Sequence, residues 1–165
     1  MIRIETATID DWRTIRDLRL DALAKAAGML NASGEPAPED DTGWQEYLTK
    51  RLSDGNIIFI AYDGETPVAA GNGKPNPYKA DAYVLHSLWV TPDARGKGIA
   101  KLLNAARVKH AQQQGYKYAQ ACCNIRNEKS MGLYRSLGYT EMPEPSEFRP
   151  AQAAHEVVFY LAIAG

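Results

Sequence analysis

Arg95-Gly96-Lys97-Gly98-Ile99-Ala100 joins an apolar strand, predicted over residues 82–90, to an amphipathic helix. Gly96 and Gly98 lack a Cβ atom, so the backbone can turn tightly there and its N–H groups can converge on one point. The first N–H groups of a helix have no partner within the helix and lie at the positive end of its dipole. The stretch therefore predicts a binding site for an anion such as a diphosphate.

Two better-known phosphate-binding loops do not match this stretch. The nucleoside triphosphate loop needs a Ser or Thr soon after its last glycine and a longer spacing before it, whereas Ile99 follows Gly98 here. The dinucleotide fingerprint G-x-G-x-x-G needs a third glycine, and Lys101 stands at that position. Both kinds of nucleotide loop are therefore excluded.

The stretch instead resembles the pyrophosphate signature Arg/Gln-x-x-Gly-x-Gly/Ala of the GNAT superfamily of acyl-CoA-dependent N-acyltransferases. The similarity extends over residues 88–94 before it and 101–103 after it. A second segment, Asn127–Tyr139, resembles the other hallmark of the family: an asparagine, a short helix carrying Leu-Tyr, then Leu-Gly-aromatic. Because both segments occur in the family's order, the chain is identified as a member of this superfamily.

The length of 165 residues predicts a single domain over residues 1–165, of the α/β (α+β) class. Runs of strands with helices between them favour a mixed, mostly antiparallel sheet of about seven strands with helices on both faces. The resemblance further implies that the two central strands splay apart. We expect strands over 2–6, 56–62, 66–73, 82–90, 118–124, from 139, and over 156–163. We expect helices from the capping box Thr8–Asp11 to Gly28, over 44–52, from 99 to Gly115, and over 128–137, with loops over 31–42 and 143–154.

Composition excludes several classes of protein. The net charge is −1 and the pI is about 6.3, which argues against nucleic-acid binding, for which a basic face is expected. The chain has no apolar run long enough to span a membrane, and residues 1–5 lack an apolar signal core. We therefore expect a soluble, cytoplasmic protein that binds neither nucleic acid nor membrane.

The cysteines and histidines predict no disulfide and no metal site. Cys122 and Cys123 are adjacent in a strand, where neighbouring side chains point to opposite faces and cannot readily bridge. The three histidines, His86, His110 and His155, are far apart and show no metal-ligand spacing. We expect the thiols of both cysteines to be buried within the strand.

The resemblance implies acetyl-CoA as cosubstrate and direct attack of a neutral amine on its thioester. Backbone N–H groups around Leu88 and Val90 would polarise the carbonyl, while the side chains of Leu88 and Trp89 are expected in the core. Tyr134 matches the family's general acid, although a tyrosine packed on the sheet is the alternative. Tyr139 is expected in the core.

The sequence identifies the general base less clearly than the general acid. Histone-type relatives carry a glutamate where this chain has Val84, and valine cannot take a proton. His86 lies two residues later and faces the same way on an ideal strand. Residues 85–90, Leu-His-Ser-Leu-Trp-Val, match the Leu-His-x-Leu-x-Val run of arylalkylamine acetyltransferases. Either His86 or a water chain therefore takes the proton, and a purely structural histidine is the alternative.

The coenzyme residues follow from the same resemblance. Asn127 would bind the pantetheine arm, cap the helix that follows it, or do both. Lys97, Lys101 and Arg135 add charge near the phosphates or are solvated. The implied coenzyme-binding residues are Leu88, Trp89, Val90, Arg95, Gly96, Lys97, Gly98, Ile99, Ala100, Lys101, Asn127 and Ser130.

The acceptor is a primary amine of a small amine, an amino acid or a peptide. The family's acceptor sites correspond here to residues 26–44 and 143–155. These segments carry acids that either attract a cationic amine or are solvated: Glu35, Glu39, Asp40, Asp41, Glu144 and Glu147. A non-catalytic acyl-CoA sensor is the alternative function, and a homodimer is left open.

Overall fold

The computed structural model describes residues 1–26, 36–142, 147–148 and 156–164. Its strands are β1 (Ile2–Thr6), β2 (Ile57–Asp63), β3 (Thr66–Pro75), β4 (Ala82–Val90), β5 (Tyr118–Asn124), β6 (Thr140–Met142) and β7 (Glu156–Ala162). Its α-helices are α1 (Trp12–Lys25), α2 (Asp41–Arg51), α3 (Ile99–Gln113) and α4 (Glu128–Ser136). The 3₁₀ turns η1 (Ile9–Asp11) and η2 (Pro92–Ala94) precede α1 and the loop before α3.

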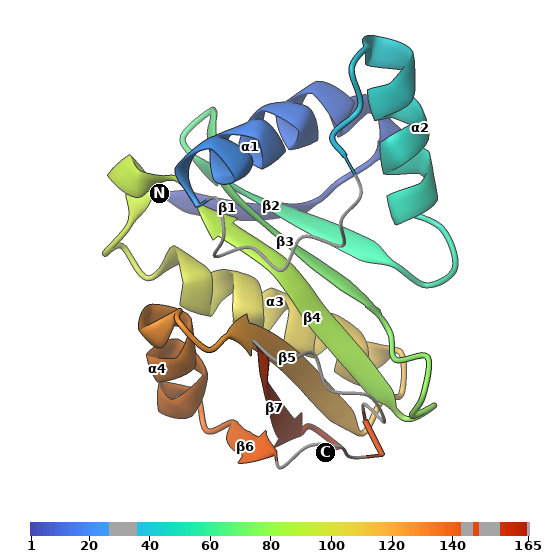
Figure 1. Cartoon of the computed structure of the whole chain (residues 1–165), viewed down its shortest axis with the longest axis vertical. Coiled ribbons are helices and arrows are strands. Elements are labelled where there is room, and N and C mark those ends of the chain that lie inside the picture. Colours follow the sequence, from blue (N-terminus) through green and yellow to red (C-terminus); the bar gives the residue numbers. More distant parts are fainter. Residues whose placement is uncertain (27–35, 143–146, 149–155, 165) are drawn as a thin grey trace.

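The strands form one seven-stranded sheet in the order β1-β2-β3-β4-β5-β7-β6 (Figure 1). Among the described strands, β4 and β5 pair in parallel and every other neighbouring pair is antiparallel. The predicted mixed, mostly antiparallel sheet is therefore confirmed. No helix in the described part of the chain is long and apolar enough to cross a bilayer.

Helices cover both faces of the sheet, as predicted. Buried side chains of α1 and α2 pack on Ile58 and Ile60 of β2 and on Ala70 of β3, which defines the α1 face. Ile99 and Leu103 of α3 pack on the opposite side of β2 and β3, which defines the α3 face. α4 packs on the same face as α3, since its Met131 and Tyr134 share a core cluster with Ala111 of α3.

The central strands β4 and β5 separate, as the resemblance implied. Their parallel pairing runs from Ala82 opposite Tyr118 to Leu85 opposite Ala121 and stops there. Beyond Leu85, β4 continues to Val90 with no partner on β5 among the described residues. The separation exposes one edge of β4 between α1 and α4, where the site described below lies (Figure 1).

A β-bulge interrupts the pairing of β3 with β4 at the same point. Ala70 lies opposite Trp89 and Asn72 lies opposite His86, so Gly71 faces two residues of β4. Ser87, one of these two, has φ of 51°, in the left-handed region that side chains other than glycine seldom adopt. The bulge shifts the residues after Ser87 by one position relative to β3.

Most predicted boundaries agree with the structure within a few residues. α2 begins at Asp41 instead of Trp44, because the Asp40 side chain accepts a hydrogen bond from the Gly43 N–H (2.7 Å) and caps the helix earlier. β3 continues two residues beyond Gly73. The predicted helix end at Gly28 and most of the predicted loops over 31–42 and 143–154 lie outside the described residues.

Candidate active site

Two cavities meet where β4 leaves β5. The first, about 530 Å³ in volume, lies beside the Arg95–Gly98 loop and is called the loop cavity here. The second, about 400 Å³, contains His86 and is called the histidine cavity. Leu88, Asn127 and Ser130 line both cavities, so a molecule in one can reach a molecule in the other at this junction.

The loop cavity gathers the residues that sequence reasoning assigned to the coenzyme. Of the twelve, it is lined by Leu88, Trp89, Val90, Arg95, Gly96, Gly98, Ile99, Ala100, Lys101, Asn127 and Ser130. Lys97 does not line it, because its Nζ atom lies 2.8 Å from Oδ2 of Asp63 and lowers the pKa of that carboxyl. Lys97 therefore ties the loop to the end of β2.

The Arg95–Gly98 loop has the backbone conformation that the predicted anion-binding site requires. Gly96 and Gly98 have φ of 79° and 75°, which only glycine adopts without strain. A Cβ atom added at either glycine would meet no other atom within 4 Å, so the space beside the loop is open. Within the part of the chain that the structure describes, no side chain caps the N-terminus of α3, which leaves its first N–H groups available to a ligand.

Trp89 and Arg95 form one wall of the loop cavity. The Trp89 Nε1–H donates to Oδ2 of Asp21 on α1 (2.9 Å), and the Arg95 guanidinium lies 4.9 Å from the Trp89 ring centre. The Arg95 Nε–H also donates to the Val90 carbonyl (3.1 Å). Leu88 and Trp89 are half-buried and line the cavity, so the expectation that both are core residues holds only in part.

Tyr134 of α4 lines the histidine cavity near the junction. Its side chain is 4% exposed and stacks on Phe159, with ring centres 5.9 Å apart. Burial raises the pKa of the Tyr134 hydroxyl, and the positive charge of Arg107 opposes that shift. The phenol is therefore protonated at neutral pH, the form in which it can donate a proton.

Tyr139 lies in the core, as predicted. It is 5% exposed, and its hydroxyl donates to Oδ1 of Asn104 on α3 (2.9 Å). The Tyr139 ring packs edge-on against Tyr134, with ring centres 5.2 Å apart. Of these two neighbouring tyrosines, Tyr134 alone lines a cavity among those described.

His86 lies in the histidine cavity together with Val84, so the two side chains share one face of β4 as expected. Its Nδ1 atom lies 3.0 Å from the Ser87 hydroxyl. Burial, together with the smaller effect of the cations Lys74, Arg51, Arg107 and Arg19, lowers the pKa of His86 to about 3. The imidazole is neutral at physiological pH, the form that accepts a proton, but its basicity in the free protein is low.

Sequence reasoning missed Arg107, which lies beneath the β-bulge. Its side chain is fully buried, and it donates to the carbonyls of Leu103 (3.3 Å), Asn72 (3.2 Å) and His86 (3.4 Å). The remaining nitrogen, Nη2, has no hydrogen-bond partner among the described residues. The spacing of the helix could have predicted that Arg107 is buried. It lies four residues from both Leu103 and Ala111, which are on the buried side of α3.

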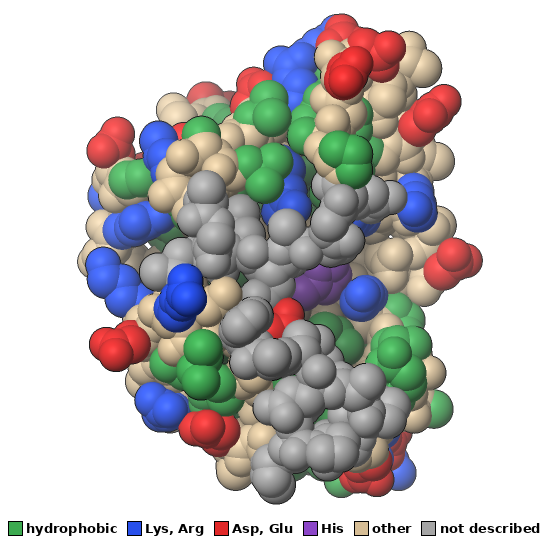
Figure 2. Space-filling model, in the orientation of Figure 1, with side chains coloured by type: hydrophobic (Ala, Val, Ile, Leu, Met, Phe, Trp, Pro, Cys, Tyr) green, Lys and Arg blue, Asp and Glu red, His purple; other side chains and the backbone are tan. Residues whose placement is uncertain are grey.

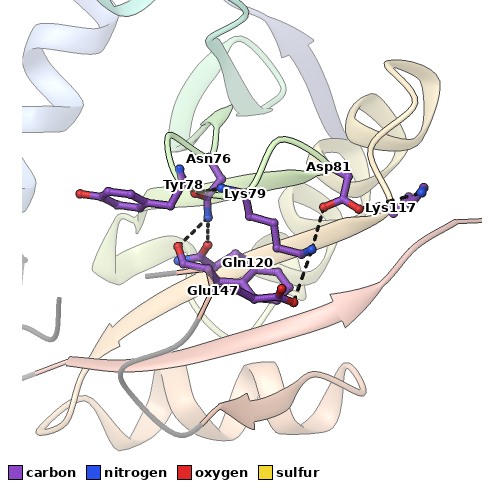
Figure 3. Close-up of polar contacts among 8 residues, drawn as sticks. Asn76, Tyr78, Lys79, Asp81, Lys117, Gln120 and Glu147 are labelled. Atoms are coloured by element: carbon purple, nitrogen blue, oxygen red, sulfur yellow. Dashed lines mark hydrogen bonds and ion pairs between the residues drawn. The ribbon is translucent and has the colours of Figure 1, made fainter. Parts of the chain in front are cut away.

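An amide network builds the outer wall of the histidine cavity (Figure 3). The Asn76 Nδ2 group donates to Oε1 of Gln120 and to the Phe148 carbonyl (2.9 Å). Its Oδ1 atom accepts from the N–H groups of Tyr78 (2.7 Å) and Lys79 (3.0 Å). One buried asparagine thereby holds together the β3–β4 connection, β5 and the segment before β7.

The acids expected near the acceptor have other partners. Asp40 caps α2, Asp41 lies 3.5 Å from Arg16, and Glu147 lies 3.4 Å from Lys79. Glu39 is exposed, while Glu35 and Glu144 lie outside the described residues. None of the four described acids lines the loop cavity or the histidine cavity.

Comparisons with known proteins agree with this geometry. Residues 12–139 match the model of the acetyltransferase (GNAT) family. The chain is similar to the L-methionine sulfoximine/L-methionine sulfone acetyltransferase of Pseudomonas paraeruginosa, with 32% identity over 125 residues covering 72% of this chain and 73% of the relative.

Solved structures share the fold. The ribosomal-protein-alanine N-acetyltransferase of Brucella melitensis has a TM-score of 0.76 and 21% identity, and the match covers 97% of this chain and 99% of that one. The phosphinothricin acetyltransferase of Sinorhizobium meliloti, in complex with acetyl-CoA, has a TM-score of 0.77 and 18% identity over 99% and 89% of the two chains. The chain therefore belongs to the acetyltransferase (GNAT) family and is an acetyltransferase.

Proposed function

We propose that the protein transfers the acetyl group of acetyl-CoA to the primary amine of a small molecule, by direct attack on the thioester. The observation that carries this proposal is the junction of the two cavities at Leu88, Asn127 and Ser130. Acetyl-CoA in the loop cavity and an amine in the histidine cavity meet there, beside Tyr134.

The loop cavity suits the pyrophosphate and the pantetheine arm of the coenzyme. Its pyrophosphate fits the open space over Gly96 and Gly98, where the uncapped N-terminus of α3 supplies N–H donors and a favourable dipole. Arg95 adds a positive charge at the same mouth. Asn127 accepts from the Ser130 N–H (3.2 Å) and so caps α4, while its position in both cavities suits contact with the pantetheine arm.

Each step of the transfer has a candidate group. Backbone N–H groups of β4 around Leu88 and Val90, beyond the point where β5 leaves, polarise the thioester carbonyl. The amine nitrogen forms a bond to the carbonyl carbon, the C–S bond breaks, and the Tyr134 hydroxyl donates its proton to the departing thiolate. The proton of the attacking amine passes to His86 or through water.

Two further observations support an enzyme over a coenzyme sensor. Tyr134 lines the histidine cavity together with Asn127 and Ser130 of the junction, which provides a proton donor there that coenzyme binding alone does not need. The Pseudomonas relative is named as an acetyltransferase of L-methionine sulfoximine and L-methionine sulfone, which are small molecules with one primary amine. A small amine is accordingly the acceptor that we propose.

The test is thiol release from acetyl-CoA across a panel of small amines, amino acids and short peptides. We expect release above the amine-free background with one class of small amine, together with an equal amount of N-acetylated product by mass spectrometry. Acetyl-CoA binding without thiol release for every amine in the panel would contradict the proposal. Release with peptides alone would contradict the small-molecule acceptor.

A further inference from the structure

Three cationic side chains from separate elements converge on the histidine cavity. Arg19 of α1, Arg51 of α2 and Lys74 of β3 all line it. The strand register explains the position of Lys74, which lies opposite Val84 and, like His86, on the α1 face. Figure 2 shows a histidine in a hollow between the two halves of the molecule, with a Lys or Arg side chain beside it.

Two of the three cations stand outside the ion pairs of the described residues. Within the described residues, neither Arg19 nor Lys74 forms an ion pair. Arg51 lies over the Tyr47 ring, 4.8 Å from its centre. The described lining also contains one acid, Glu156, so positive charge is in excess.

These charges act on the His86 imidazole, which lines the same cavity. Arg19, Arg51 and Lys74 each lower the pKa of His86, which shows that their fields reach the imidazole. Such a potential repels an acceptor that carries only an ammonium group. It favours an acceptor in which an anionic group accompanies the amine.

We infer that the acceptor carries a carboxylate, as an α-amino acid does, and that Arg19 and Lys74 bind this group while the amine points toward the junction of the cavities. The inference rests on the proposed acetyl transfer and narrows its substrate class. The carboxylate neutralises the excess positive charge, and guanidinium and ammonium groups are its natural partners. Of the two alternatives that the sequence left open for the acids of residues 26–44 and 143–155, attraction of a cationic amine or solvation, this inference agrees with solvation.

The experiment compares matched acceptors in the thiol-release assay. Each L-amino acid is paired with its carboxamide, which keeps the amine and the side chain but removes the negative charge, and phosphoethanolamine distinguishes a phosphate from a carboxylate. Each acceptor is tested on the wild type, Arg19→Gln, Lys74→Met and Lys74→Glu. Arg13→Gln on α1 and Lys109→Met on α3 are matched controls, since both side chains are exposed and neither lines a described cavity.

We expect kcat/KM to be about 10- to 100-fold higher for an amino acid than for its carboxamide, the range that one charged hydrogen bond supplies. Arg19→Gln and Lys74→Met should reduce that ratio mainly through KM, Lys74→Glu should reverse it, and the two controls should keep it. Equal or better use of carboxamides would overturn the carboxylate inference and leave acetyl transfer intact. Preference for phosphoethanolamine would also overturn it.

A binding measurement separates this inference from the proposed function. Saturation-transfer NMR with a mixture of N-acetyl-L-amino acids, and with a mixture of their amides, reports on the histidine cavity without turnover. We expect signals from the acids that Lys74→Glu abolishes and Lys109→Met retains. If no amine releases thiol, acetyl transfer fails, whereas equal binding of both mixtures, or of neither, contradicts the carboxylate site.

Discussion

Removing the hydroxyl group of Tyr134 separates its chemical role from its packing role. In Tyr134→Phe the ring keeps its contacts with Phe159 and Tyr139, at 5.9 and 5.2 Å between ring centres. General acid catalysis contributes about 10²- to 10⁴-fold, and we expect the lower end because the open cavity admits water as a substitute donor. We therefore expect kcat to fall about 100-fold, roughly 2.7 kcal/mol of transition-state stabilisation.

The matched control is Tyr139→Phe, which removes the same atom from the neighbouring tyrosine. Its hydroxyl donates to buried Asn104, so its loss leaves an acceptor unpaired and should cost about 1–3 kcal/mol of unfolding free energy. Urea unfolding and thiol-release rates at saturating substrates measure the two effects. We expect Tyr134→Phe to lose kcat with near-normal stability, and Tyr139→Phe the reverse. Wild-type kcat in Tyr134→Phe would refute the general-acid role.

Other parts of the site give further measurable expectations. Gly98→Ala should cost about 1–2 kcal/mol of unfolding free energy in urea, because φ at Gly98 is 75°, and should raise KM for acetyl-CoA but not for the amine. His86 should titrate by NMR well below 6.5, and Lys74→Met should raise its pKa by removing a nearby positive charge. Because the unfolded chain protonates His86 near 6.5 and the folded chain near 3, the unfolding free energy should fall as pH drops through this range, and His86→Asn should flatten that dependence. Asn76→Ala should cost about 1–3 kcal/mol in urea unfolding, since it leaves Gln120 and the Phe148 carbonyl without their donor.

The local structure around the loop cavity was predictable because its determinants are local. The bounds of β4 and β5 agree with prediction, since each is an apolar run ended by polar or turn residues. Gly96 and Gly98 identify the loop by themselves, as positions where the backbone takes positive φ. Lys97 shows the limit of this reasoning. Its neighbours in sequence suggested that it lies near a phosphate, whereas its Nζ atom forms an ion pair with Asp63, at the end of β2.

The composition of the histidine cavity was not predictable, because its residues meet only through the sheet. Arg19, Arg51 and Lys74 come from two helices and a strand, and each is unremarkable in its own segment. Three acids that the sequence analysis considered for the acceptor have structural partners instead. Asp40 caps α2, and Asp41 and Glu147 form ion pairs. Charge at a site depends on strand register and helix placement, which the sequence of one segment does not contain.

The bulge in β4 explains how one strand serves two cavities. Residues that pair across adjacent strands have side chains on the same face of the sheet. Ala70 and Asn72 of β3 have their side chains on the α1 face, so their partners on β4, Trp89 and His86, lie on that face as well. His86 and Trp89 are three residues apart, an odd separation that strict alternation would put on opposite faces. The extra residue at the bulge reverses the alternation, so Leu88 and Val90 pack with the α3 cluster while His86 faces the acceptor side.

Arg107 holds this reversal in place. Its Nη1 atom bonds the carbonyls of Asn72 and His86, which flank the interrupted pairing, from the α3 side of the sheet. Gly71 makes the room, because a Cβ atom there would lie 3.2 Å from the Arg107 guanidinium carbon. The buried guanidinium therefore donates to two backbone carbonyls beside the bulge, next to Ser87 with its left-handed φ of 51°.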